Sequence, residues 1–301
     1  NYGMNGEYNM LGNLSSPRLS RIFMNRQTAS ESFFLDPLDF NLRTPQNHLF
    51  YNTKSPFTNL TYFTAGDKTV GDDHIKALFT VNANKRFNVG FVIDYLYARG
   101  YYQYQGISHT NGTLFSSYQG DHYSLHAMFS TNHMKMVENG GIEDDMFITD
   151  PEQMAGSITS NTIPTLLSRT WKRHDNQTFF LNHHYDVGFN RLTEESIREF
   201  VPVTSFIHTL QFDRNKHEFR SYENLDDFFA RDYLPSDTTS DISHYLSIKN
   251  TFAIQLKEGF HKWAQFGLTG FVRANIRSYK MADLNEENLP YQRKYNQTLI
   301  T

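Results

Sequence analysis

The sequence contains no cysteine and no long uninterrupted run of apolar residues. Without cysteine, the chain cannot form a disulfide scaffold, a Cys-ligated zinc site or a catalytic thiolate. No stretch reaches the roughly 18 apolar residues that a membrane-spanning helix requires, so that class is excluded as well. The 28 basic and 32 acidic residues nearly balance and are interspersed, which gives no support to a nucleic-acid surface.

Aliphatic residues are scarce, but aromatic residues are abundant. Only 39% of the 301 residues are hydrophobic, against roughly 45–50% in ordinary soluble domains. Yet 15% are aromatic, with 26 Phe and 18 Tyr. A polar chain that is poor in aliphatic residues and rich in aromatic rings is an unusual combination.

The dominant pattern has a period of two residues, which is typical of strands. In Phe87–Ala98, apolar residues at odd positions alternate with mostly polar or small residues, and Lys85-Arg86 predicts a tight hairpin with a similar segment before it. The alternation recurs over 179–189, 246–256 and 265–277. These runs exceed the average of about 5–6 residues for globular strands and fit the roughly 9–11 residues of a bilayer-crossing strand.

The predicted connections alternate in length. Short ones are expected near Lys85, Gly120, Asp175, Asn215 and Gly259, and long polar ones at 66–73, 99–110, 132–164, 190–202 and 224–243. This alternation requires a weak strand at Leu166–Arg173, and Thr193–Phe200 could form a short loop helix. Short turns on one side and long loops on the other are typical of outer-membrane barrels, with periplasmic turns and extracellular loops.

We therefore predict an all-β fold, an antiparallel transmembrane β-barrel with about thirteen or fourteen strands in this chain. Residues 1–301 would form a single barrel domain. The chain starts at Asn1 without a methionine and ends inside a predicted strand, which predicts a fragment of a longer barrel chain with an even strand number.

Hydrocarbon offers no hydrogen-bond partners, so one face of each strand must be apolar while the face toward the lumen can be polar. The residues predicted to face lipid are Phe79, Phe87, Val89, Phe91, Ile93, Tyr95, Tyr97, Phe266, Leu268 and Val272. Those predicted to line the pore are Lys76, Asn82, Asp94, His126, Asn182, Asp186, Lys249, Arg273, Asn275 and Arg277. Inward charges could set ion selectivity, or they could pair to stiffen the barrel or hold a plug.

Several segments resemble the "Putative porin" family of Bacteroidetes. They include Leu19–Phe23, Phe50–Leu60, Asp94–Gly100, Glu138–Ile142, Val201–His208 and Leu246–Phe260, of which the Asn52–Leu60 block is the most specific. The resemblance spans nearly the whole chain. It implies an outer-membrane barrel in a longer chain, without enzymatic activity, and it transfers no catalytic residue.

No residue cluster predicts catalysis, a cofactor or a metal. His183 and His184 are adjacent and would project to opposite faces of a strand, and His122 and His126 would be too far apart to share a metal. The acidic loops around Asp72 and Asp144 lack the spacing of an EF-hand and are better explained as solvated charges. Asp237-Thr238-Thr239 resembles an O-glycosylation site, but such a short motif arises readily by chance.

Three functions follow from this interpretation. The leading hypothesis is an outer-membrane porin-like channel of a Gram-negative, Bacteroidetes-type bacterium, for passive diffusion of small hydrophilic solutes. Its partners would be outer-membrane lipids and lipopolysaccharide, with surface lipoproteins or a homo-oligomer as further possibilities. The alternative is a non-conducting barrel acting as a scaffold or export partner for surface lipoproteins or other barrels. A soluble β-sandwich or propeller that binds carbohydrate is a third reading of the same alternation.

Overall fold

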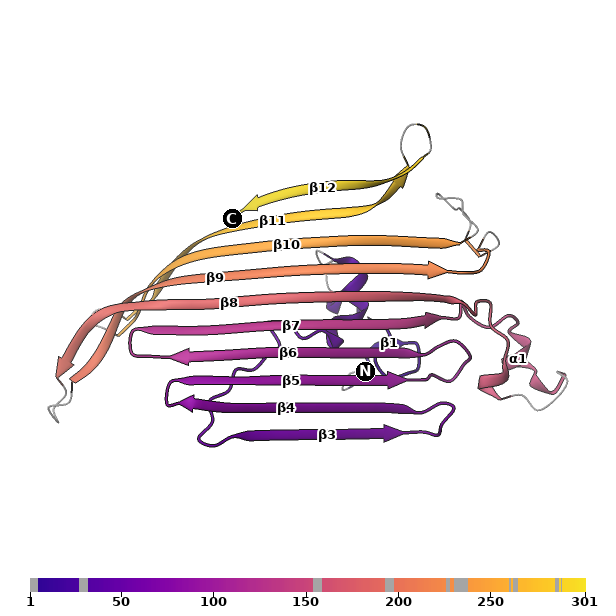
Figure 1. The fold of residues 1–301 in the computed structure, drawn as a ribbon, viewed down its shortest axis with the longest axis horizontal. Helices are drawn as coiled ribbons and strands as arrows, with labels where there is room; N and C mark the ends of the chain where they lie inside the picture. Colours follow the sequence, from indigo (N-terminus) through magenta and orange to yellow (C-terminus); the bar gives the residue numbers. More distant parts are fainter. Residues whose placement is uncertain are drawn as a thin grey trace.

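A computed structural model of the chain shows a large antiparallel sheet with few helices (Figure 1). It describes residues 5–26, 32–153, 159–192, 198–225, 228–229, 238–259, 261, 265–284, 287 and 289–301. Ten strands form the sheet in sequence order: β3 (Phe57–Ala65), β4 (Asp72–Asn84), β5 (Phe87–Ala98), β6 (Ile107–Gln119), β7 (Tyr123–Glu138), β8 (Thr170–Leu192), β9 (Arg198–Ser221), β10 (Thr239–Leu256), β11 (Leu268–Leu284) and β12 (Pro290–Ile300).

The remaining elements are small. β1 (Tyr8–Met10) and β2 (Arg18–Ser20) form a two-stranded sheet, and the short 3₁₀ helices are η1 (Phe23–Asn25), η2 (Phe33–Asn41), η3 (Pro151–Gln153) and η4 (Ser160–Thr162). The α-helix α1 (Met146–Thr149) lies in the connection between β7 and β8. No helix in the described part of the chain is long and apolar enough to cross a membrane.

The sheet has two distinct ends. Connections 66–71, 99–106, 139–169, 222–238 and 285–289 leave the loop end, where α1 also lies (Figure 1). Connections 85–86, 120–122, 193–197 and 257–267 leave the opposite turn end. The two longest connections, 139–169 and 222–238, leave the loop end as predicted. The connection near Gly259 was predicted to be short, but at 257–267 it is longer than the loop-end connections 66–71, 99–106 and 285–289.

Three predictions about the strands were wrong. Short turns were expected near Asp175 and Asn215, but β8 and β9 run through both positions as single strands of 23 and 24 residues. The segment Leu166–Arg173 is not a strand of its own: its last four residues are the first four of β8, and the others precede that strand. The sheet accordingly has ten strands, not thirteen or fourteen.

The segment 190–202 was also misplaced. It was predicted as a loop on the side of the long connections, but residues 190–192 and 198–202 belong to β8 and β9, which join at the turn end. The loop helix predicted at Thr193–Phe200 lies outside the described residues at 193–197, and its last three residues are in β9. The O-glycosylation-like motif begins at Asp237, which is also outside the described residues.

Strand register places large apolar residues side by side across the sheet. One row, which we call the Phe91 row, crosses eight neighbouring strands through Phe79, Phe91, Leu114, Phe129, Phe179, Phe212, Ile248 and Ile276. Side chains alternate between the faces of a strand, so this row lies on one face, here called the Phe91 face, while Asp94 belongs to the opposite Asp94 face. Phe91, Leu114 and Phe129 are 37%, 61% and 44% exposed, so the row has no protein layer over it.

The apolar zone on the Phe91 face crosses the strands diagonally. In β5 it extends from Phe87 to Tyr97, mostly toward the loop end from the Phe91 row. In β8 it starts at Phe179, in the same row, and extends toward the turn end as far as Phe189. A zone of constant height shifts along successive strands in this way when the strands are tilted, as in the wall of a barrel.

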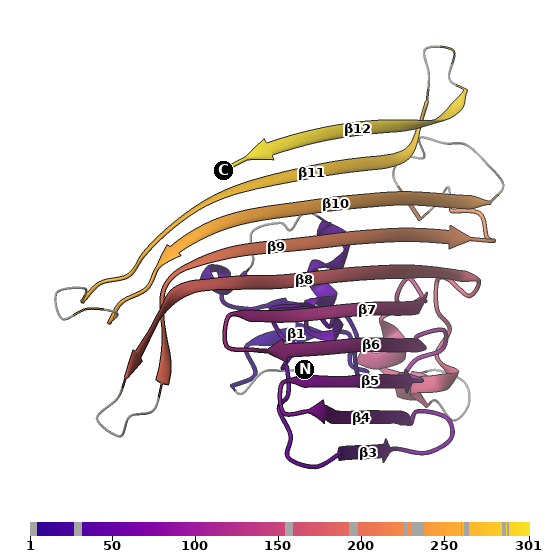
Figure 2. The ribbon, with the colours of Figure 1, turned by 60° about the vertical axis from the view of Figure 1, so that its left-hand side comes forward.

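The sheet is curved but not closed (Figure 2). β3 and β12 are its two edges, and neither pairs with the other. Residues 5–26 and 32–56, which we call the N-terminal segment, pack on the Asp94 face of the central strands (Figures 1 and 2).

Candidate pore surface

The ten residues predicted to line a pore all lie on the Asp94 face. Lys76 and Asp94 are direct partners in β4 and β5, Lys249 opposes Asn275 in β10 and β11, and the other positions follow by register. Nine residues predicted to face lipid lie in strands on the Phe91 face, and Phe266 is exposed just before β11. The two predicted sets therefore lie on opposite faces of the sheet.

Four asparagines form a hydrogen-bonded row across the Asp94 face. Asn111 Nδ2 donates to Asn132 Oδ1 at 2.8 Å, and Asn132 Nδ2 donates to Asn176 Oδ1 at 2.8 Å. Asn176 Nδ2 then donates to Asn215 Oδ1 at 2.5 Å. All four side chains are buried, and an amide can both donate and accept, so each member satisfies its neighbour.

The same row continues beyond the asparagines at both ends. Toward β4 it reaches Asp94 and Lys76. Toward β12 it continues through Tyr245, Tyr279 and Tyr295, with ring centroids 4.9 and 6.4 Å apart. The polar face therefore changes along one line from charged groups to amides and then to phenol rings.

The N-terminal segment covers the strands that carry these asparagines. Leu35 and Leu38 pack against Ile107, Met134 and Met136 in one buried cluster. Phe50 and Tyr51 pack against a second cluster of Val92, Phe115 and Met128. These large apolar residues on an otherwise polar face explain why the segment stays on it.

Polar contacts fix the segment at specific positions. The Thr53 amide donates to Asn82 Oδ1 at 3.1 Å, and the Arg43 amide donates to Asn132 Oδ1 at 3.4 Å. The rings of Phe50 and His126 lie 4.8 Å apart. Two residues predicted to line a pore, Asn82 and His126, therefore contact the N-terminal segment.

His48 is the most unusual member of the segment. Its side chain is only 6% exposed, packs against Phe50 and Phe115 at 4.9 and 4.6 Å, and has no hydrogen-bond partner for either ring nitrogen. Burial, reinforced by the charge of Arg43, lowers the pKa of His48 from 6.5 to about 4. The imidazole therefore acts as a neutral packing group at neutral pH.

A hollow of about 520 Å³ remains between the N-terminal segment and the sheet. Arg43 lines it from the segment, while Lys76, His74 and Asp94 line it from the sheet. His74 Nε2 lies 2.7 Å from Asp94 Oδ1, so the carboxylate is already partnered. The arrangement is a polar, partly enclosed space with both signs of charge.

On the Asp94 face of β10–β12, four basic residues outnumber two carboxylates: Lys249, Arg273, Arg277 and Arg293 against Asp241 and Asp283. Lys249, Arg273 and Arg277 border a hollow of about 280 Å³, which Gln46 of the N-terminal segment also reaches. Arg273 Nε donates to Thr251 Oγ1 at 3.1 Å. Asp186 and Asn182 lie on β8, where the Asp186 carboxylate accepts from Lys257 Nζ at 3.0 Å. Cations arranged in this way would favour anionic solutes in a water-filled passage.

The histidines do not gather into a metal site. His183 and His184 project to opposite faces; His183 pairs with His208 at 2.9 Å, whereas His184 lies near Asp186. His122 precedes β7 and packs against Phe200, whereas His126 contacts Phe50. Within the described ranges, no group of three or more His, Asp or Glu residues is arranged to hold a metal ion.

The N-terminal segment was not predicted from the sequence to be part of this surface. The useful signal was its position before Phe57, the first residue of the sheet, together with apolar residues at Leu35, Leu38 and Phe50 that follow no strand period. A second signal lay on the sheet. Met128, Met134 and Met136 are apolar residues in the polar register of β7, and such residues need a partner from elsewhere in the chain.

The chain matches a protein-family model described as "Putative porin", and the match covers residues 1–301. No curated protein matches the chain. The sheet, its exposed apolar zone and its polar opposite face agree with that family, whose members are not enzymes. The chain belongs to this porin family.

Proposed function

We propose that the chain forms part of the wall of an outer-membrane β-barrel channel through which small hydrophilic solutes diffuse passively. The observation that carries the proposal is the diagonal apolar zone of the Phe91 face, opposite a polar face with partnered charges. Lipid contact explains why so many Phe, Leu and Ile side chains are exposed, since a soluble monomer rarely leaves so large an apolar surface uncovered. The ten predicted pore residues would then face the lumen, and those of β4–β8 would lie on the side that the N-terminal segment covers.

Two open sheet edges cannot persist in hydrocarbon, because unpaired backbone groups find no partner there. We propose that further strands close the barrel between β3 and β12, in a longer chain of which residues 1–301 are part. A complete barrel of roughly 16 or more strands would leave an aqueous channel. The loop end would face the exterior and its lipopolysaccharide, the turn end the periplasm of a Gram-negative bacterium of the Bacteroidetes type.

The N-terminal segment would narrow this channel from one side. It covers β4–β8 and reaches β9, where Phe34 stacks on His217, so the passage would run along β10–β12, past Lys249, Arg273 and Arg277. This route predicts a preference for anions over cations. Additional strands would contribute lining groups of their own.

The same segment supports the alternative function. A cover that packs through two apolar clusters could close the lumen, and the barrel would then serve as a scaffold or export partner for surface lipoproteins or other barrels. The long connections at the loop end would provide the docking surface.

Conductance of the purified full-length protein in planar bilayers separates the two functions. Stable, voltage-insensitive steps with anion preference would support the channel. A protein that inserts and shows heat-modifiable migration, but never conducts and is isolated with partner proteins, would support the scaffold instead.

A further inference from the structure

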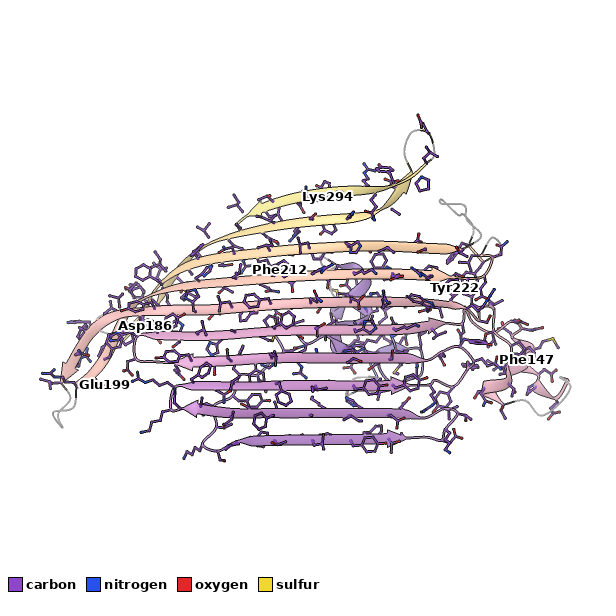
Figure 3. All side chains as sticks on the ribbon, in the orientation of Figure 1. Phe147, Asp186, Glu199, Phe212, Tyr222 and Lys294 are labelled. Atoms are coloured by element: carbon purple, nitrogen blue, oxygen red, sulfur yellow. The ribbon has the colours of Figure 1, made fainter. Side chains whose placement is uncertain are left out.

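A row of cationic side chains lies on the Phe91 face, beyond the apolar zone toward the loop end. Register aligns Lys216, His244, Lys280 and Lys294 on four adjacent strands, β9 to β12. Arg214 lies two residues from Lys216 on the same face of β9. Figure 3 labels Phe212 of the Phe91 row and Lys294 of this cationic row.

These residues surround a concave site. A hollow of about 410 Å³ is lined by Arg214, His244, Leu246, Ser278, Lys280 and Lys294, together with Tyr245. No carboxylate belongs to this lining. The hollow is therefore lined by three permanent cations, a histidine and three uncharged neighbours.

The nearby acidic groups are paired with cations outside the lining of the hollow. Glu218 contacts Arg173, Lys216 and Arg220 at 2.7, 2.9 and 2.7 Å. Asp175 contacts His133 and, at 3.4 Å, Arg173. Within the described ranges of the chain, Arg214, Lys280 and Lys294 form no ion pair. The hollow therefore has a positive charge that the protein itself does not balance.

The apolar zone lies directly beside the hollow. Ile248 and Ile276 of the Phe91 row are four residues from His244 and Lys280 on β10 and β11, and Leu246 lies between them in the lining. A lipid with acyl chains on the Phe91 face would place its headgroup at this height. Lys and Arg beside such a zone attract the anionic headgroups of a charged leaflet.

We propose that this hollow binds a phosphate group of an anionic lipid in the leaflet on the loop side. The lipid is lipopolysaccharide, and the phosphate belongs to its phosphorylated glycolipid headgroup. Arg214 would bind phosphate oxygens in a bidentate manner, and Lys280 and Lys294 would act as point charges. The proposal rests on the membrane orientation given under the proposed function, but it does not require that the barrel conduct.

The test uses the full-length protein in detergent, titrated with diphosphorylated lipid A and with the same lipid after chemical removal of both phosphates. The variant replaces Arg214, Lys280 and Lys294 with Gln together. The control replaces Lys85, an exposed lysine of the 85–86 turn at the opposite end of the sheet. Heat-modifiable migration checks that each protein is folded.

The triple variant should bind diphosphorylated lipid A at least about tenfold more weakly, since three surface cations are lost. Lys85→Gln should bind like wild type, and dephosphorylated lipid A should bind wild type and triple variant alike. Unchanged affinity in the folded triple variant would overturn the proposal. So would displacement of the lipid by inorganic phosphate at equal phosphate concentration, because the hollow would then be a site for free anions. A wild-type protein that binds the lipid but never conducts would refute only the channel.

Discussion

Phe91 and Asp94 show how sharply one strand separates two environments. They are three residues apart in β5, yet Phe91 lies 37% exposed in the row of eight large apolar side chains, and Asp94 lies beside His74 on the polar face. An Arg in the lipid-facing middle of a barrel strand costs about 2–4 kcal/mol. Phe91→Arg should therefore impair folding far more than Asp94→Arg, as measured by the fraction of heat-modifiable barrel. An equal loss of folded barrel in the two variants would contradict the assignment of Phe91 to lipid and of Asp94 to the lumen.

His48 makes the N-terminal segment sensitive to acid. Its pKa is about 4 in the folded protein and near 6.5 when exposed, so the released segment binds the proton more readily. The docked state keeps its full stability above pH 6.5 and loses up to about 3 kcal/mol as the pH falls to 4. The hydrogen-exchange protection factors of residues 33–52, which are corrected for the intrinsic exchange rate at each pH, should fall over this range. In His48→Phe the phenyl ring should still pack against Phe50 and Phe115, but it cannot bind a proton. If the docking of this variant depended on pH as in the wild type, groups other than His48 would be responsible.

The asparagine row couples four strands, and its central member should be the most sensitive. Asn132→Ala removes the donor to Asn176 Oδ1 and the acceptor for Asn111 Nδ2 and the Arg43 amide. A buried polar group left without a partner costs about 1–3 kcal/mol, which should appear as a lower urea midpoint for barrel unfolding. Asn296→Ala, on the exposed edge strand β12, provides the matched control. A variant at Asn132 as stable as that control would show that water replaces the amide contacts.

At the same scale, β8 and β9 show where sequence interpretation succeeds and fails. The period of two residues predicts the faces of the strands, because alternation is a local property of extended backbone. The turns predicted near Asp175 and Asn215 were wrong, since polar residues favour turns only when their side chains bond to nearby backbone. Here Asn176 and Asn215 bond to each other across the strands, and the sequence does not reveal such a partner. The cover over the Asp94 face was missed for a similar reason, because its contacts join residues far apart in the chain.

Across the whole molecule, the tilt of the strands and the N-terminal segment would together determine what the proposed channel can do. The diagonal apolar zone would set the height of the wall in the membrane, and the segment, which covers β4–β8 and reaches β9, would leave the Asp94 face of β10–β12 open. The tilt of the strands and the docking of the segment each depend on the arrangement of many residues, so neither could be predicted from a short sequence motif. The family match adds the class of protein but no solute.

Release of the N-terminal segment should therefore enlarge the channel. Leu38 is 2% exposed and packs in the cluster with Met134 and Met136. In Leu38→Asp a docked segment would bury an unpaired carboxylate, which is unfavourable, so the segment should detach from β6 and β7. Leu19→Asp is the control, because Leu19 is 52% exposed in the same segment. We expect Leu38→Asp to raise single-channel conductance in planar bilayers and to weaken anion preference, since Lys76 and Asp94 would join the lining. Identical conductance in Leu38→Asp, Leu19→Asp and wild type, with faster hydrogen exchange in the first alone, would show that the segment detaches without having narrowed the passage.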